Sequence, residues 1–200
     1  MRIQHLRPSD YRRVRWKNGG GWTTELTVAP ASDGAGDFDW RISIAEIESD
    51  GAFSTFAQCD RFIALLDGNG MRLDFDSAPS ALLDRRLRFV PFSGDWKTYG
   101  TLIDGPVRDF NVIVRRNRVQ AEIHHRPLVG TTVFPANPQV TWFVYLLRGH
   151  ASVQGRLDAR HSGRPMIESG DALLLDKDEA MSNCILDGGG ELLLVKLTRL

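Results

Sequence analysis

Residues 60–70, Asp60-Arg61-Phe62-Ile63-Ala64-Leu65-Leu66-Asp67-Gly68-Asn69-Gly70, are an apolar run that ends in a glycine turn. Residues 141–151 have the same arrangement, Thr141-Trp142-Phe143-Val144-Tyr145-Leu146-Leu147-Arg148-Gly149-His150-Ala151. A Ser-Gly-Asp follows each copy, at 93–95 and at 169–171, with slightly different spacing. Two copies of one β unit are what a duplicated barrel leaves in a sequence. The alternative is chance, because apolar strands that end at glycine recur in β proteins.

Short β segments with period-two alternation dominate the rest of the chain, separated by clusters of Gly, Pro, Asn and Asp. They lie at residues 40–45, 62–66, 71–75, 110–115, 119–125, 141–147, 172–175 and 191–197. No stretch keeps an amphipathic helical stripe over several turns, and the best helix candidate, residues 81–87, is short. Asp187-Gly188-Gly189-Gly190 predicts a hairpin turn before the last strand. The pattern predicts an all-β sandwich or barrel.

Composition and charge exclude several functional classes. With 42% hydrophobic and 25% charged residues, the chain has the composition of an ordinary soluble globular protein. Lys and Arg together equal Asp and Glu at 25 each, so nothing indicates a partner nucleic acid or membrane surface. The first residues contain no apolar segment of signal-peptide length, and no later run approaches the roughly 20 apolar residues that span a bilayer. We therefore expect a cytoplasmic protein.

The pattern of cysteines and histidines predicts neither a metal nor a cofactor. Cys59 and Cys184 are the only cysteines and neither stands in a CxxC motif, so a disulfide framework and a thiolate zinc site both lack residues. The adjacent pair His124 and His125 point to opposite faces of a strand and cannot chelate one ion together. The other histidines stand alone, as expected of surface residues: His5, His150 and His161. Serines and cysteines occur in no nucleophile-elbow or Cys-His signature.

The segment Trp16-Lys17-Asn18-Gly19-Gly20-Gly21-Trp22-Thr23-Thr24-Glu25 carries the strongest indication of a binding site. Three glycines permit positive φ and a close approach of the backbone, and the polar side chains of Asn18, Thr24 and Glu25 flank them. A phosphate-binding loop is excluded because neither Lys-Ser/Thr nor a long helix follows the glycines. The alternative is a flexible connection between strands.

A second set of polar side chains lies on the strand at residues 40–45. Arg41 and Ser43 share one face of this strand, opposite an apolar face. An arginine on the inner wall of a small barrel needs a buried acid or a ligand carboxylate as its partner. The alternative is an arginine that faces solvent. Asn111 has the same placement in its own strand, and we expect it near Arg41. Arg61 is either a second cation for an anionic ligand or a partner in a local salt bridge.

Together these segments resemble the HutD/Ves family in order and spacing. The resemblance covers most of the first 115 residues; the remainder matches in length and β character only. The segments that carry it are Trp16 to Gly21 with Thr24-Glu25, Trp40 to Ala45, Asp50-Gly51 with Phe53-Ser54 and Phe56, Asp60-Arg61, and Asp109-Phe110-Asn111.

The resemblance implies a bicupin of the RmlC-like superfamily without a metal, with two jelly-roll-like β-barrel halves. We place the N-terminal barrel, with a pocket, at residues 1–115 and the C-terminal barrel at 116–200. The family occurs beside histidine-utilisation genes or as a stress-associated protein. Its proposed role is to bind a carboxylate metabolite such as urocanate or formylglutamate. The positions carried over as ligand-binding are Asn18, Thr24, Glu25, Arg41, Ser43, Arg61 and Asn111.

Three functions are compatible with this sequence. The first is a regulatory binding protein in which Arg41 is the main anchor of a small carboxylate, oriented by Asn111 and the glycine backbone. The second is a metal-independent isomerase or hydrolase with Glu25 as a general base, its pKa raised by burial. The third is a structural partner protein with an empty barrel. Exposed barrel edges often pair, so we also expect a homodimer.

Overall fold

The computed structural model describes residues 1–200 except 33, 35–36, 158–164 and 178–181. In this part of the chain the secondary structure is β apart from one 3-10 turn, η1 (Pro8–Asp10). The short helix candidate at 81–87 is not a helix: β8 (Ala81–Leu83) pairs with β7 (Met71–Phe75) and buries Leu83 in the apolar core. Among the described residues, no helix is long and apolar enough to cross a membrane.

The chain divides into two compact units, residues 11–118 and residues 119–200 together with 1–10. The sequence predicts a boundary after residue 115, with the first ten residues in the N-terminal half. In the structure β1 (Arg2–Leu6) pairs antiparallel with β16 (Ala172–Asp176), so the N-terminus belongs to the C-terminal unit. Such a long-range pairing leaves no local signal in the sequence.

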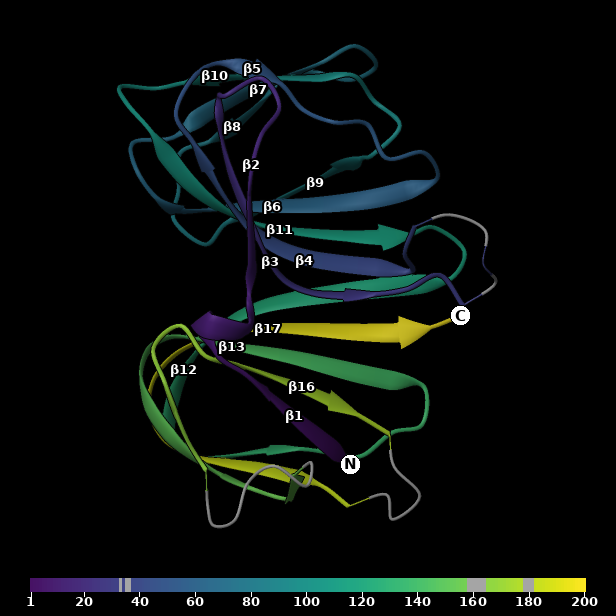
Figure 1. The fold of residues 1–200 in the computed structure, drawn as a ribbon, viewed down its shortest axis with the longest axis vertical. Coiled ribbons are helices and arrows are strands. Elements are labelled where there is room, and N and C mark those ends of the chain that lie inside the picture. The colour runs from purple at the N-terminus through teal and green to yellow at the C-terminus, as the bar shows by residue number, and fades with distance from the viewer. Residues whose placement is uncertain (33, 35–36, 158–164, 178–181) are drawn as a thin grey trace. The chain divides into compact units, whose positions relative to one another are not determined.

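Residues 11–118 form two antiparallel sheets, the larger of which is seen in Figure 1. Its strands, in spatial order, are β2 (Arg12–Arg15), β3 (Gly21–Ala29), β4 (Trp40–Ile47), β11 (Val107–Arg115), β6 (Cys59–Asp67) and β9 (Phe89–Ser93). The smaller sheet has the order β5 (Gly51–Ala52), β10 (Thr98–Leu102), β7, β8. Apolar side chains of both sheets form one cluster: Ala45, Ile47, Ile63, Leu65, Met71, Leu73, Leu83, Phe92 and Val107.

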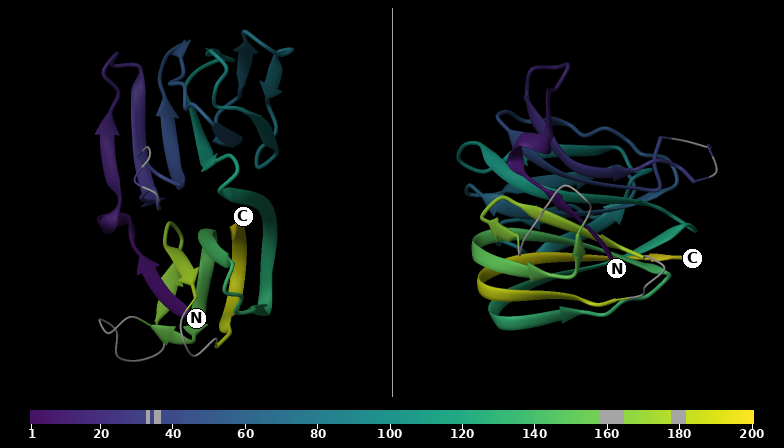
Figure 2. Two further views of the ribbon diagram at one scale, coloured as in Figure 1. Left: turned by 90° about the vertical axis from the view of Figure 1, so that its right-hand side faces the viewer. Right: turned by 60° about the horizontal axis from the view of Figure 1, so that its bottom comes forward.

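The other unit is built on one sheet of seven strands. Its spatial order is β12 (Val119–Phe134), β17 (Cys184–Arg199), β13 (Val140–Gln154), β16, β1 and β14 (Arg156–Leu157), and β15 (Met166–Glu168) pairs with β13. The long strands β12, β13 and β17 bend along their length (Figure 2). Buried residues from these strands and from β1, β15 and β16 fill the interior.

The predicted hairpin turn at residues 187–190 is wrong, because these residues lie inside β17. Gly190 pairs with Gly149 of β13, and Gly188 with Gly130 of β12. A Cβ atom at Gly149 or Gly190 would meet the backbone of the neighbouring strand, and both residues have positive φ. The glycines therefore allow adjacent strands to approach closely in the middle of their length.

Both units contain four strands in the same arrangement. In one unit four strands lie side by side in the order β4, β11, β6, β9. In the other unit four strands lie in the order β12, β17, β13, β16. In both units the last of the four strands along the chain therefore lies between the first and the second, and the third lies beside the second. The two repeated segments of the sequence lie in β6 and β13, which hold the same place in this order. Gly68 and Gly149, which end the apolar runs, both have φ of 98°. This shared order supports the duplication, although strand pairing among the described residues closes neither unit into a barrel.

Candidate functional site

A cavity of about 540 Å³ opens in the unit of residues 11–118. Its walls come from β3, β4, β6 and β11, from the ends of β2 and β5, and from the segments 16–18 and 53–56 that follow these two strands. Strand register brings the polar groups together: Asn111 lies opposite Ser43, and Ile113 lies between Arg41 on β4 and Arg61 on β6. Because side chains alternate between the faces of a strand, these five share one face. Five of the seven predicted positions line this cavity: Asn18, Arg41, Ser43, Arg61 and Asn111.

Arg61 is the most deeply buried cation of the cavity, with 3% of its surface exposed. Its guanidinium carbon lies over three aromatic rings, 5.4 Å from the centroid of Phe53, 5.3 Å from Phe56 and 4.8 Å from Phe92. Nη1 donates to the Ser54 carbonyl oxygen at 3.1 Å, whereas Nε has no hydrogen-bond partner among the described residues. Burial lowers the pKa of Arg61 to about 10, so the guanidinium remains charged at neutral pH.

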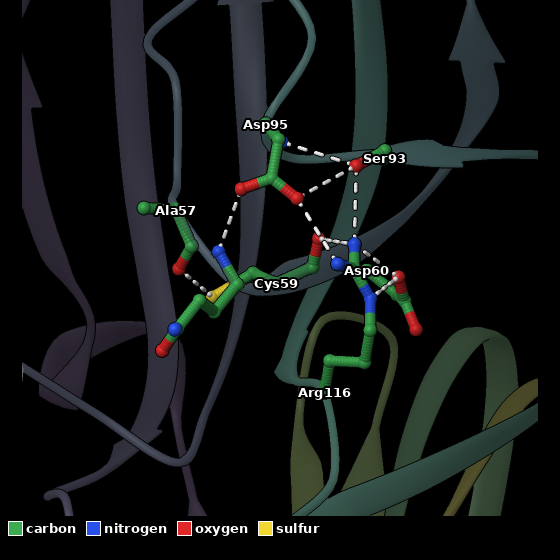
Figure 3. Close-up of polar contacts among 7 residues, drawn as sticks. Ala57, Cys59, Asp60, Ser93, Asp95 and Arg116 are labelled. Atoms are coloured by element: carbon green, nitrogen blue, oxygen red, sulfur yellow. Dashed lines mark hydrogen bonds and ion pairs between the residues drawn. The ribbon is translucent and has the colours of Figure 1, made fainter.

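Among the described residues Arg61 forms no salt bridge, and Asp60, which precedes it in the sequence, is engaged by another arginine. Arg116 donates through Nε to Asp60 at 2.9 Å and through Nη1 to Asp95 at 3.1 Å (Figure 3). Asp95 also accepts the backbone N–H of Gln58 at 2.8 Å. This network ties the ends of β6, β9 and β11 together. Burial raises the pKa of the adjacent Cys59 thiol, which disfavours the reactive thiolate.

Asp109 is a buried acid behind the cavity that the sequence pattern did not single out. It is fully buried, and neither carboxylate oxygen has a hydrogen-bond partner among the described residues. Burial raises the pKa of Asp109 to about 7, against the opposing charge of Arg61. One feature of the sequence could have indicated Asp109: it lies two residues before Asn111 in an apolar strand, so both side chains are on the same face.

Arg41 is held by an acid of its own unit. Its Nε donates to Glu25 Oε2 at 2.7 Å, and about a quarter of each side chain is exposed. Glu25 and Arg41 both line a smaller adjoining cavity of about 270 Å³. The sequence left a buried acid, a ligand carboxylate or solvent as possible partners of Arg41, and in the structure its partner is the acid Glu25. This ion pair offsets the charge that Arg41 presents to the larger cavity.

Thr24 points away from both cavities. It lies opposite Ile44 of β4 and Arg13 of β2, on the other face of β3 from the cavity. Thr23, one residue earlier, lines the cavity instead and accepts a hydrogen bond from Trp16 Nε1 at 2.7 Å. An offset of one residue exchanges the faces of a strand, and the resemblance to the family did not resolve it.

The glycine segment forms a tight turn between β2 and β3 whose amides are occupied. Gly19 N–H donates to the Trp16 carbonyl at 3.0 Å, and Gly20 N–H donates to Asn18 Oδ1 at 3.0 Å. Gly19 has φ of 73°, and a Cβ on Gly21 would meet the Glu46 carbonyl. The prediction that these glycine amides receive a ligand is therefore wrong for Gly19 and Gly20: the glycines shape the turn that holds Trp16 and Asn18 against the cavity.

The histidines and cysteines are dispersed. In the described part of the chain, no group of three or more His, Cys, Asp or Glu side chains is placed to hold a metal ion. His5 is not a surface residue: its side chain is 2% exposed and its Nε2 lies 2.9 Å from Asp171 Oδ2. His124, His125 and His150 are exposed, and His161 lies outside the described residues. Burial raises the pKa of Cys184 to about 12.

These features define an all-β protein with a cavity lined by both charged and aromatic side chains. Solved structures show which fold it has. Solved structures with cupin-type folds share it at 10% identity with a TM-score of 0.68, which shows the fold alone. The HutD family model matches residues 8–194. The chain therefore belongs to the HutD family.

Individual relatives agree with this assignment. HutD from Pseudomonas fluorescens SBW25 is 32% identical, with a TM-score of 0.80 over 99% of both chains. Protein Ves of Cronobacter sakazakii is 33% identical over 82% of this chain and 87% of its own length. An uncharacterized 21.2 kDa protein in the hutC 3′ region of Pseudomonas putida is 46% identical over 60% of this chain. The matched stretch spans 63% of that relative's length.

Proposed function

We propose that the cavity binds a small carboxylate metabolite and that the protein regulates a pathway through this binding. The observation that carries the proposal is Arg61, a buried cation whose Nε–H has no hydrogen-bond partner among the described residues. Buried polar groups are usually satisfied, so an unsatisfied donor beside a cavity indicates a missing partner. The buried Oδ1 of Asn111 is also unsatisfied, and it lies in the same wall.

The charges of the lining favour an anion. Four cations and no acid occur among the cavity residues: Arg15, Lys17, Arg41 and Arg61. Lys17 is exposed to solvent. Arg15 is paired with Glu48 at 2.9 Å, and Arg41 with Glu25. Arg61 is therefore the cation best placed to hold a carboxylate. A planar guanidinium held by aromatic rings is also well ordered before a ligand arrives. We therefore propose Arg61, instead of Arg41, as the main anchor.

Histidine utilisation is the pathway that the relatives' names support. One relative is named HutD and another lies in a hutC region. A ligand of the urocanate or formylglutamate type would fit this setting. The stress-related role that the family resemblance implies stays the other candidate. A cytoplasmic location, the absence of a cofactor and a homodimer stay predictions. The repeated strand order supports our further proposal that both units derive from one duplicated cupin-type half.

The enzymatic alternative has less support. Glu25 was the candidate general base, but its carboxylate accepts a hydrogen bond from Arg41 at 2.7 Å and is therefore engaged. A carboxylate held in this ion pair is less available to accept a proton from a substrate. The geometry therefore favours binding without turnover.

Calorimetric titration with urocanate, formylglutamate and acetate, combined with turnover assays, tests the proposal. We expect saturable binding of at least one carboxylate and no turnover. The double variant Arg61→Met, Asp109→Asn removes both buried charges and should weaken binding by roughly tenfold to a hundredfold, because a charge-assisted contact contributes about 1.5–3 kcal/mol.

The matched control is Arg72→Met, which removes an exposed arginine of the same unit. Its affinity should equal that of the wild type. If the double variant binds every carboxylate as tightly as the wild type, the cavity is not anchored by Arg61 and the proposal is wrong.

A further inference from the structure

Asp109 lies where the cavity meets the apolar cluster of its unit. It is opposite Ala45, which lines the cavity, and opposite Leu65, which belongs to the cluster. The register between β11 and β6 shifts between Arg108 and Asp109. Bulges of this kind re-aim a side chain and occur beside functional sites. The local geometry thus places a carboxylate where side chains are otherwise apolar.

The charged surroundings of Asp109 are simple. Arg61 is the one described group whose charge acts on it. Its two partners in the neighbouring strands, Ala45 of β4 and Leu65 of β6, are both apolar. The groups that interact electrostatically with Arg61 are Asp109, Arg41 and Cys59. A buried carboxylate without hydrogen bonds is stable only with a compensating charge or a proton.

We infer that Asp109 is the counter-ion of Arg61 while the cavity is empty, and that it takes up one proton when a carboxylate binds to Arg61. This inference rests on the proposed function, because it requires an anion at Arg61. Asp109 does not itself have to touch the ligand, since it acts through Arg61. It is therefore a positioning residue that makes the site bind an anion together with a proton.

The physical reason is thermodynamic linkage. Burial holds the pKa of Asp109 at about 7, and Arg61 is what keeps it from rising further. A bound carboxylate neutralises the field of Arg61 and adds a second negative charge, so the pKa of Asp109 rises in the complex. If binding raises the proton affinity of Asp109, protonation must equally raise the affinity for the anion. Affinity should therefore fall as the pH rises.

The test measures acetate and formylglutamate, whose carboxylates stay ionised, between about pH 5.5 and about pH 8.5. We expect a dissociation constant that is flat at the acidic end and rises by about tenfold per pH unit above about pH 7. Asp109→Asn should bind with a flat profile, at the affinity that the wild type reaches in acid. The exposed Asp74→Asn, in the same unit, should keep the wild-type profile.

A second measurement uses the wild type alone, in case the substitution disturbs folding. Calorimetry at about pH 8 in two buffers with different ionisation enthalpies should show uptake of about one proton per bound probe. No histidine lines the cavity among the described residues, so no histidine there mimics this signal. A flat wild-type profile without proton uptake overturns the coupling and leaves the proposed function intact. Absence of binding at every pH overturns the proposed function itself.

Discussion

The two units put different side chains at the same point of a shared strand pattern. Arg61 of β6 and Trp142 of β13 hold the same place in the repeated segment, two residues before Ile63 and Val144 of the respective clusters. Arg61 borders a cavity, whereas Trp142 packs against the apolar cluster of its unit, with its ring 5.5 Å from that of Phe134.

The remaining buried polar residues follow the same division. Among the described residues, those in 11–118 are Ser43, Arg61, Thr98, Asp109 and Asn111, whereas the other unit has Thr141 and the buried side chain of His5. The interior of the C-terminal unit is therefore mainly apolar, which stabilises the fold. The unit of residues 11–118 keeps more buried polar groups, whose desolvation is costly. This contrast is what a functional cavity in one half of a duplicated protein predicts.

The largest expected effect is a loss of stability in the C-terminal unit. Leu146→Ala should lower the free energy of unfolding by about 3–5 kcal/mol, because Leu146 is fully buried among closely packed neighbours that cannot collapse into the space. Leu65→Ala, at the corresponding place of the other unit, should cost nearer to about 2 kcal/mol, since the neighbouring cavity gives its surroundings room to relax. Urea unfolding of both variants measures the difference, and equal losses would contradict the contrast.

The next effect is the stability cost of Asp109. Its pKa is about 7 in the folded protein against an ordinary 3.8, so the folded state holds this proton more tightly and stability falls as the pH rises from about 4 to about 7. Asp109→Asn removes this loss and should gain at most about 4 kcal/mol at about pH 8 relative to its effect at about pH 4. Unfolding curves at both pH values check the gain, and a gain that does not depend on pH would be inconsistent with a buried titrating acid.

The smallest effect is expected at the partly exposed ion pair. A double-mutant cycle of Arg41→Met and Glu25→Gln should give a coupling of about 1 kcal/mol in ligand-free melts, because solvent screens a pair of which a quarter is exposed. Arg41→Met should also weaken carboxylate binding less than loss of Arg61 does. If Arg41→Met lowers the affinity more than the loss of Arg61 does, Arg41 is the main anchor.

Much of the cavity was predictable from the sequence, because the inward positions of a strand repeat every second residue. This rule placed Arg41 and Ser43 on one face and Asn111 on the matching face of its own strand, and all three line the cavity. The rule cannot say which neighbour each strand receives. The pairing of Arg41 with Glu25 and the burial of Arg61 among aromatic rings depend on that choice.

The errors have the same origin. Thr24 was chosen where Thr23 lines the cavity, because a family resemblance does not settle a one-residue register. The glycines at 188–190 were interpreted as a turn because glycine marks turns and close strand contacts alike, and only the paired strand distinguishes the two.

The sequence by itself determined the all-β class, the repeated strand pattern, the family and most of the polar face, since these depend on alternation and composition along the chain. The tertiary structure decided the membership of β1 in the C-terminal unit, the depth of Arg61 and the isolation of Asp109. Burial and charge compensation are properties of neighbours in space, and strand pairing brings together residues that are distant in sequence. For that reason the acid that we infer to couple binding to a proton was not recognised until its surroundings were known.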